Sequence, residues 1–305
     1  MTRFEVVAMA LAPDRHIAVF VDHYRRKGAA RVRVYFDGAA EAAPRPADVG
    51  LGDEALIVCD DAFWARRGGR PTSVEARQRR VYKDAYDKIV ADWLVVVDID
   101  ELIHCDASLD AVLSAAPASR DLVIFPTVEA VWRVGDDLDR EYGARFARKA
   151  YSGLFWSELS YCLYPGAGAF FVRGLLGHHM GKYAVRRGKV GVTACIHEAK
   201  QDGAPLKAVS ARDPLNGRPV WLLHYDAISL DAWRAKWDRR LETGDTIEIG
   251  RRRRRQQMVY AKARETGHER ALFARLYSLT NLQIWVLRRL GLLLDIKVGD
   301  RATRN

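Results

Sequence analysis

The sequence predicts an α/β fold in which helices flank a mostly parallel, Rossmann-like sheet. Through the first 130 residues, short apolar runs alternate with helical segments, a pattern typical of doubly wound sheets. Residues 93–97 (WLVVV) are apolar at every position, as expected of a central parallel strand covered on both faces. The pattern loosens beyond Val128, and helical signal then persists from Ser229 nearly to the end. We therefore expect a main domain over residues 1–230 and a helical, basic C-terminal region over 231–305 that packs on it.

The individual elements follow from local patterns. Strands are expected at 4–11, 31–36, 55–59, 93–97, 121–127 and 220–225, each a short apolar or alternating run. A first helix has Ile17, Phe20, Val21 and Tyr24 on one face and ends at Gly28. A second begins at 72–75 (TSVE), which has capping-box spacing. A third covers 109–115, and Ser229 is the expected N-cap of a later helix. The aromatic, glycine-rich residues 155–174 suggest irregular structure with short strands.

Composition narrows the class of protein. The chain has 305 residues, of which 49% are hydrophobic and 29% charged, values typical of a globular protein. Its four cysteines are scattered without a CxxC pair, which favours a reduced, cytoplasmic protein. The N-terminal residues suggest a first strand and not a signal peptide. No uncharged apolar run approaches the roughly 20 residues that span a bilayer.

The positive charge is concentrated at one end. Residues 233–305 hold 18 Lys and Arg against 8 Asp and Glu, which accounts for the whole net charge of +10. Within this region lies the run 251–255 (RRRRR), either a solvated helix face or a site of peripheral contact with anionic lipid on the inner face of the membrane. Residues 271–294 form either an amphipathic surface helix or a packed one. No nucleic-acid-binding motif accompanies this charge, so no nucleic-acid partner is expected.

Acidic residues follow two of the predicted strands. Asp98, Asp100 and Glu101 come directly after the apolar strand, and Asp37 ends an earlier one. In a parallel sheet these positions meet at the carboxyl edge, where ligands bind. Carboxylates so close together repel one another unless a cation relieves them. Hard carboxylate oxygens suit Mg²⁺ or Mn²⁺ held together with substrate phosphates.

Several motifs resemble those of glycosyltransferases with the GT-A fold, in the family 2-like and family 92-like group. WLVVVDIDELI is similar to the group's W-hydrophobic-DxDEF segment, and LLHYDAISLDAW is similar to its HY element. Further matches are VFVDHYRRKGAARVRVYFDGA, the helix carrying Gln78 and Tyr82, and GKYAVRRGKVGVTACIH. The resemblance runs from about Phe4 to Trp237. It departs where members carry Asn-Glu after the first strand, because this chain has residues 11–14 (LAPD) there.

The resemblance implies a nucleotide-diphospho-sugar transferase fold and transfer of a sugar from a UDP- or GDP-sugar to a glycan, glycolipid or other hydroxyl acceptor. The implied residues are listed by role. Metal ligands for Mn²⁺ or Mg²⁺ are Asp98, Asp100 and His224; donor-binding residues are Asp37, Gln78, Asp98, Lys182 and Arg186. An inverting reaction also needs a general base, for which Glu158 is the first candidate beside Glu129, His178 and His179. Glu101 is placed with Glu158 in the catalytic set, where it is expected to support the metal site or to cap the following turn.

Other functions stay open at this point. A metal-dependent nucleotidyltransferase would place an ion on a diphosphate with the same acids. A non-catalytic protein that binds anionic surfaces would use the basic C-terminal region alone. A dinucleotide-dependent enzyme is disfavoured, because no G-x-G-x-x-G follows the first strand.

Overall fold

The computed structural model describes residues 2–153, 155–242 and 251–296. By its contacts the chain divides into two compact units. Unit 1 comprises residues 1–126 and 180–222, and unit 2 comprises residues 127–179 and 223–305. The chain thus leaves unit 1 after β6, forms part of unit 2, and returns to unit 1 at β9. The boundary predicted near residue 230 concerns functional domains and stays a prediction, whereas this division follows the contacts.

Unit 1 contains most of the strands. Its helices and strands, in chain order, are β1 (Phe4–Ala10), α1 (Asp14–Arg26), β2 (Arg31–Phe36), β3 (Leu56–Val58), α2 (Asp61–Ala65), α3 (Val74–Asp87), β4 (Trp93–Val96), β5 (Glu101–His104), α4 (Leu109–Ser114), β6 (Leu122–Phe125), β9 (Lys182–Arg186), β10 (Val192–Ala194), β11 (Ala199–Gln201), β12 (Ala204–Pro205) and β13 (Ala208–Ser210). Short 3₁₀ turns lie at Ala40–Ala42, Pro46–Val49 and Asp53–Ala55.

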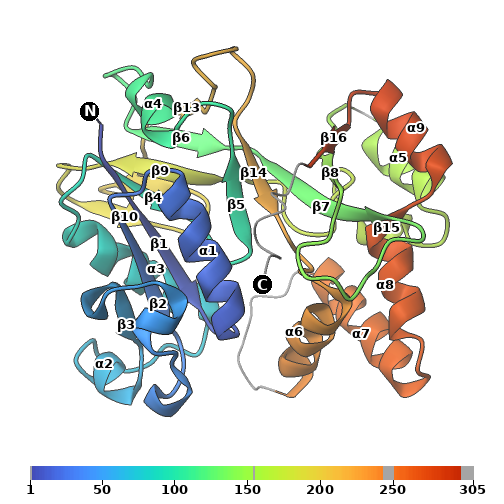
Figure 1. Ribbon diagram of the computed structural model, residues 1–305, viewed down its shortest axis with the longest axis horizontal. Helices are drawn as coiled ribbons and strands as arrows, with labels where there is room; N and C mark the ends of the chain where they lie inside the picture. Colours follow the sequence, from blue (N-terminus) through green and yellow to red (C-terminus); the bar gives the residue numbers. More distant parts are fainter. Residues whose placement is uncertain (1, 154, 243–250, 297–305) are drawn as a thin grey trace. The chain divides into compact units, whose positions relative to one another are not determined.

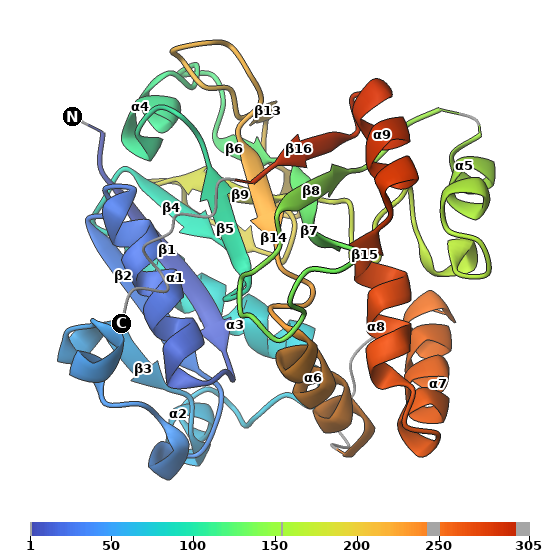
Figure 2. The same ribbon diagram turned by 45° about the vertical axis from the view of Figure 1, so that its right-hand side comes forward.

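A seven-stranded sheet in the order β13-β6-β9-β4-β1-β2-β3 forms the centre of unit 1. Strands β4, β1, β2 and β3 run parallel, whereas β9 is antiparallel to both β4 and β6. Helix α1 lies on one face of the sheet and α3 on the other (Figures 1 and 2). The predicted α/β class with a parallel-rich sheet and flanking helices is confirmed.

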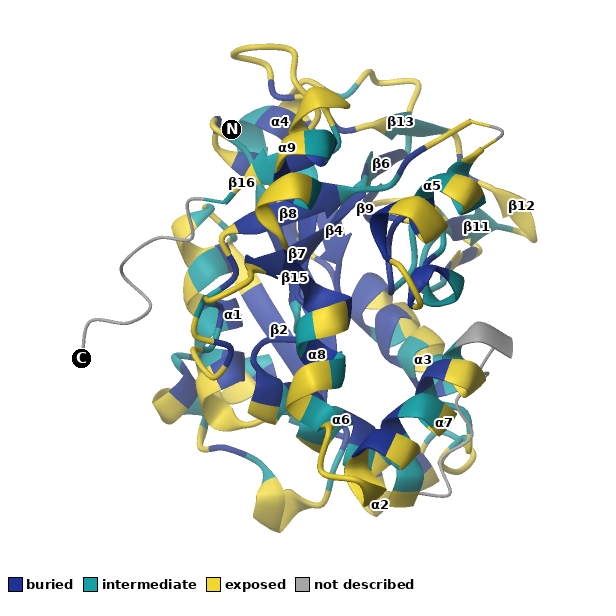
Figure 3. Ribbon diagram, turned by 90° about the vertical axis from the view of Figure 1, so that its right-hand side faces the viewer, coloured by how far each residue is buried: buried dark blue, intermediate teal, exposed yellow. Residues whose placement is uncertain are grey.

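The apolar side chains that predicted the strands of this sheet are buried in its core. Alternate residues of β1 and β4, among them Val7 and Val96, pack in one core with Val81, Tyr82 and Ala85 of α3. Burying an aliphatic side chain of this size contributes about 1.5–3 kcal/mol, so this core stabilises the packing of α3 on the sheet. Figure 3 shows the resulting pattern of buried strands and helices with exposed outer sides.

Helix α3 begins one residue later than its sequence pattern predicts. Ser73 is the N-cap, and its Oγ accepts a hydrogen bond from the Ala76 N–H at 3.3 Å. The spacing from Thr72 to Glu75 is therefore not a capping box, since Glu75 instead accepts from the Ser73 hydroxyl. The prediction of Ser229 is confirmed, because its Oγ accepts from the Ala232 N–H at 3.2 Å.

Unit 2 combines a small sheet with helices. Its elements are β7 (Thr127–Arg133), β8 (Phe146–Lys149), α5 (Trp156–Leu163), a 3₁₀ turn at Gly168–Phe170, α6 (Leu230–Glu242), α7 (Arg251–Glu265), α8 (Glu269–Tyr277), β15 (Ser278–Leu279), α9 (Asn281–Arg289) and β16 (Leu293–Asp295). Strand β8 lies between β16 and β7, antiparallel to both, and β15 is parallel to β7. Strand β14 (Trp221–His224) carries the chain from unit 1 into unit 2.

Two predictions about this part of the chain are wrong. Within residues 155–174, expected to be irregular with short strands, residues 156–163 instead form α5. Residues 271–294 do not form one helix, because the chain extends as β15 between α8 and α9. No helix among the described residues is long and apolar enough to cross a membrane.

Candidate functional site

The acidic residues of unit 1 lie at the carboxyl edge of the sheet. Asp37 directly follows β2 and Asp98 follows β4, two strands that flank β1 in parallel. From β1 the chain proceeds outward to β2 and β3 and then returns to β4 on the other side of β1. The strand order therefore reverses beside Asp98, and ligands of doubly wound sheets bind at such a reversal.

Three side chains fix the Asp98 carboxylate. Gln78 Nε2 and the Tyr82 hydroxyl, one turn apart on α3, donate to Oδ1 at 2.9 and 3.1 Å. Lys182 Nζ donates to Oδ2 at 2.8 Å. The structure thus brings Gln78, Asp98 and Lys182 together, as the resemblance implied. Asp100 is half-buried two residues farther along.

Lys182 reaches this edge because β9 runs antiparallel to β4. Tyr183 is opposite Val96, so Lys182 lies beside the end of β4. The glycine before it is required for this approach: a Cβ on Gly181 would lie 2.1 Å from the carbonyl oxygen of Phe125. Glycine thus lets the start of β9 close against β6 and directs the lysine into the edge.

The buried ammonium of Lys182 supplies a cation for this cluster. Its Nζ is 2.8 Å from Asp98 and 3.8 Å from Glu101 Oε2. Burial by itself would lower the pKa of Lys182, but the two carboxylates raise that pKa above its ordinary value. The lysine is therefore charged at neutral pH and offsets part of the repulsion between the acids.

Glu101 closes the turn that follows β4. Its Oε2 accepts the Asp98 N–H at 2.7 Å, and its own N–H donates to the Asp98 carbonyl at 3.1 Å. The side chain is fully buried, and burial raises the pKa of Glu101 while Lys182 opposes that rise. This geometry fits the turn-capping role, and a catalytic role for Glu101 stays a prediction.

Asp37 is bound by two arginines that sequence reasoning missed as site residues. Arg77 Nε donates to Oδ2 at 2.8 Å, and the Arg70 guanidinium lies 3.1 Å from Oδ1. Arg77 is itself buried and also donates to the carbonyl of Pro71. The sequence could have indicated that Arg77 is buried, because it lies four residues before Val81, on the apolar face of α3. The predicted contact of Asp37 with a nucleoside stays a prediction.

Arg186 is not brought together with these residues. It lies opposite Trp93 at the start of β4, four residues from Lys182 and so about 13 Å away along the strand. Its guanidinium stacks over the Trp93 ring, 4.2 Å from the ring centroid. The motif spacing was misleading here because successive residues of one strand extend away from a site at its end.

The remaining predicted residues belong to unit 2. His224 is buried at the end of β14, and its ring centroid is 5.5 Å from that of His178. Glu158 is exposed in the first turn of α5, where hydrogen bonds from its own backbone N–H and from the Ser157 hydroxyl lower its pKa. Its role as general base and the role of His224 as metal ligand stay predictions.

Glu129, another candidate base, is occupied by structural contacts. It is fully buried in an ion pair with Arg148. Its Oε2 also accepts the N–H groups of Leu176 and Gly177 at 2.9 and 2.8 Å. These contacts use both oxygens to hold the 175–177 loop.

Part of the arginine run is also structural. Arg253 pairs at 3.0 Å with Asp226, which is buried and also accepts from the Tyr277 hydroxyl at 2.6 Å. Burial alone would raise the pKa of Asp226, but Arg253 and Lys236 hold it well below its usual range. Arg254 and Arg255 are exposed, as a solvated face requires.

Comparison with known proteins gives distant structural likenesses. No protein-family model matches the chain, and no curated protein matches its sequence. HddC from Yersinia pseudotuberculosis is similar over 77% of this chain and 98% of its own, with 11% identity and a TM-score of 0.37. Residues 1–349 of TarS from S. aureus are similar over 95% of this chain and 79% of their own, with 11% identity and a TM-score of 0.36.

A third solved structure is glucosyl-3-phosphoglycerate synthase from Mycobacterium tuberculosis, in complex with Mn²⁺, UDP and glucosyl-3-phosphoglycerate. It is 17% identical with a TM-score of 0.33, over 61% of this chain. This chain spans 57% of the length of that protein. Likenesses this weak carry no argument about activity, which has to come from the residues themselves.

Proposed function

We propose that the chain is a metal-dependent glycosyltransferase of the GT-A type. It would move a sugar from a UDP- or GDP-sugar to a glycan, a glycolipid or another hydroxyl acceptor, with inversion. The observation that supports this most is the fixed Asp98 carboxylate at the reversal of strand order, held by Gln78, Tyr82 and Lys182. An edge that combines ordered carboxylates with a buried cation suits a nucleoside diphosphate and its counterion.

The oxygen ligands that this turn offers fit a hard divalent ion, Mn²⁺ or Mg²⁺. Asp98 and Asp100 offer carboxylate oxygens two residues apart, on a turn that Glu101 closes. Because Oδ1 of Asp98 accepts from both Gln78 and Tyr82, an ion bound by Asp98 would share Oδ2 with Lys182. When bound, such an ion neutralises charge that develops on the leaving diphosphate.

The protein's own residues would then have separate tasks. Gln78 and Tyr82 hold Asp98 in one orientation, and Lys182 balances the carboxylates while the donor is absent. Asp37, fixed by Arg77 and Arg70, lies at the end of β2, where it would meet the nucleoside. Glu158, an exposed carboxylate in the first turn of α5, would accept the proton of the acceptor hydroxyl.

Thermal denaturation with nucleotides tests the proposal directly. UDP or GDP together with Mn²⁺ should raise the melting temperature, and Asp100→Asn should remove most of that rise. Asp87→Asn is the matched control, because Asp87 is an exposed acid of the same unit that pairs with Lys83. If no nucleoside diphosphate shifts the melting temperature in the presence of Mn²⁺, the proposal fails.

Product analysis separates glycosyl transfer from nucleotidyl transfer. A glycosyltransferase releases a nucleoside diphosphate from a nucleotide sugar, whereas a nucleotidyltransferase releases pyrophosphate from a nucleoside triphosphate and a sugar phosphate. If the chain releases pyrophosphate and Asp100→Asn abolishes that release, Asp98 and Asp100 would belong to a nucleotidyltransferase site.

A further inference from the structure

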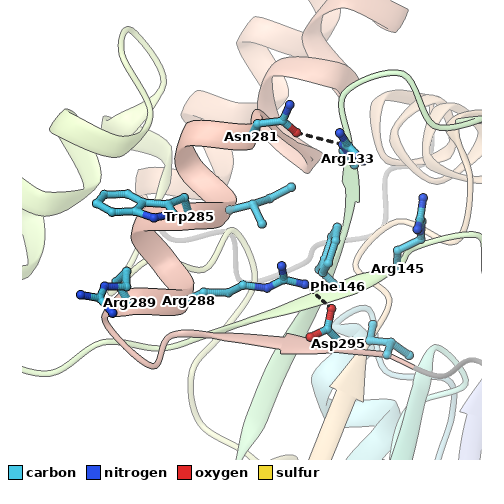
Figure 4. Close-up of a pocket in the computed structure, with 10 residues that line it drawn as sticks. Arg133, Arg145, Phe146, Asn281, Trp285, Arg288, Arg289 and Asp295 are labelled. Atoms are coloured by element: carbon cyan, nitrogen blue, oxygen red, sulfur yellow. Dashed lines mark hydrogen bonds and ion pairs between the residues drawn. The ribbon is translucent and has the colours of Figure 1, made fainter.

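Unit 2 contains a hollow of about 690 Å³ that the proposed reaction does not use. It is lined by the end of β7, the start of β8, helix α9 and the end of β16 (Figure 4). Among its lining residues are four arginines, Arg133, Arg145, Arg288 and Arg289, against one carboxylate, Asp295. Such an excess of guanidinium groups favours an anion, and phosphate is one of the anions that arginine binds in a bidentate manner.

Only part of this positive charge is balanced by contacts within the protein. Arg288 pairs with Asp295 at 2.6 Å, and Arg145 lies 3.5 Å from Asp136. Arg133 is oriented by a neutral partner instead, since its Nε donates to Asn281 Oδ1 at 3.0 Å. Within the described part of the chain, neither Arg133 nor Arg289 has an ion-pair partner. The hollow therefore retains a net positive charge.

Helix α9 places apolar side chains beside this charge, on its solvent side. It packs through Ile284 and Leu287, which are buried. Leu282, Trp285 and Arg289, at spacings of three and four, share the opposite face. Leu282 is 70% exposed and Trp285 60% exposed, and α9 is correspondingly yellow on its outer side in Figure 3. Trp285 belongs both to this face and to the wall of the hollow (Figure 4).

An exposed tryptophan, an exposed leucine and arginines are the combination found where a protein meets a lipid headgroup layer. Tryptophan favours the boundary between headgroups and acyl chains. Each arginine near an anionic surface adds electrostatic attraction to it. A soluble phosphate compound would use the arginines but would leave Leu282 and the outer side of Trp285 in water.

We propose that the arginine hollow and the outer face of α9 together dock unit 2 on an anionic phospholipid membrane, with a headgroup phosphate in the hollow. Leu282 and Trp285 then insert at the level of the headgroups, so the attachment is peripheral. This site differs from the arginine run of α7, of which Arg253 is already paired with Asp226.

Flotation of the full chain with phospholipid vesicles tests the site. The chain should bind vesicles that contain phosphatidylglycerol and not vesicles of phosphatidylcholine alone. The double variant Trp285→Ala/Arg289→Gln should lower the ratio of bound to free protein roughly tenfold. Because both side chains are exposed, its melting temperature should equal that of the wild type. Arg289→Glu alone, which retains Trp285, should lower binding in the same direction.

Helix α7 offers a matched control in the same unit. Arg254→Gln/Met258→Ala removes one exposed arginine and one exposed apolar side chain that is 62% exposed. This control should change vesicle binding less than about twofold, since the attraction of one arginine outside the contact is screened. An equal loss in both double variants would assign binding to diffuse charge and overturn the proposal.

Two other outcomes would also overturn it. One is the absence of binding to anionic vesicles. The other is a rise in melting temperature with glycerol phosphate that Trp285→Ala/Arg289→Gln abolishes, in a chain that does not float with vesicles. That result would show that the hollow binds a soluble phosphate compound and not a lipid headgroup.

Discussion

Unit 1 and unit 2 each contain a buried cation beside a carboxylate, but the two pairs differ in what surrounds them. In unit 2, Glu129 and Arg148 are both almost completely buried, and backbone N–H groups occupy the rest of the carboxylate. In unit 1, Lys182 is equally buried, yet Asp98 remains 26% exposed at the end of a strand. The first pair is sealed into a fold, and the second presents a fixed carboxylate to solvent.

The difference indicates which charged pair could bind a ligand. The buried pair of unit 2 holds a loop in place and leaves no room for a ligand beside its carboxylate. At the sheet edge of unit 1, a bound metal ion could replace Lys182 as the cation beside Asp98. Three substitutions test this comparison, in decreasing order of expected effect.

Glu129→Ala should have the largest effect on stability. It leaves the Arg148 guanidinium buried without its carboxylate, and breaking a buried pair in this way costs about 3–5 kcal/mol. Urea denaturation followed by circular dichroism measures the free energy of unfolding. Asp295→Ala breaks the exposed pair with Arg288 and should cost less than about 1 kcal/mol. Equal costs for the two variants would contradict the contrast between sealed and exposed pairs.

Lys182→Met should have an intermediate effect that depends on metal. Without the ammonium, Asp98 and Glu101 repel one another, but Gln78 and Tyr82 still donate to Asp98, so the cost should be about 1–3 kcal/mol. Mn²⁺ alone should raise the melting temperature more in this variant than in the wild type, because the ion takes the place of the ammonium. Lys189→Met, which removes the partner of Asp121 in the same unit, serves as control. An identical Mn²⁺ shift in all three proteins would show that Lys182 and the ion do not compete.

Gln78→Ala should have the smallest effect on stability. It removes one of the two hydrogen bonds to Asp98 Oδ1, worth about 0.5–1.5 kcal/mol, while the Tyr82 hydroxyl remains. The melting temperature should change little, and the dissociation constant for UDP or GDP with Mn²⁺ should rise several-fold in titration calorimetry. Gln201→Ala, which removes a hydrogen bond to the Val190 carbonyl, should leave that constant unchanged. A normal constant in Gln78→Ala would remove Gln78 from the site.

The sequence predicted the features that depend on neighbouring residues. The apolar run of β4 and the alternation in β2 identified those strands, and the acids that follow them were correctly expected at the edge of the sheet. Local patterns did not predict β9, which is short and follows the excursion into unit 2. The pairing of Arg253 with Asp226 was also missed, because five identical arginines in a row give no sign of which one is buried.

The candidate site also depends on contacts between distant residues, which local sequence patterns do not predict. Lys182 was singled out by a family-like motif, but its role as the cation beside Asp98 depends on strand pairing between residues far apart in the chain. Arg186, in the same motif, was expected at the site although the direction of β9 carries it away. Motifs thus identified candidate residues, whereas the order and direction of strands decided which of them meet.

The pairing of Phe125 with Lys182 has a consequence for how the chain can vary. The chain departs from the sheet of unit 1 at β6 and re-enters it at the adjacent β9, so everything between is an insertion with neighbouring ends. Lengthening or shortening that insertion would leave the register of β9 unchanged, provided that Gly181 can still lie against Phe125. Related chains could therefore change the length of loops within the inserted segment while Lys182 stays at the end of β4, although the buried Glu129–Arg148 pair limits changes in the core of that segment.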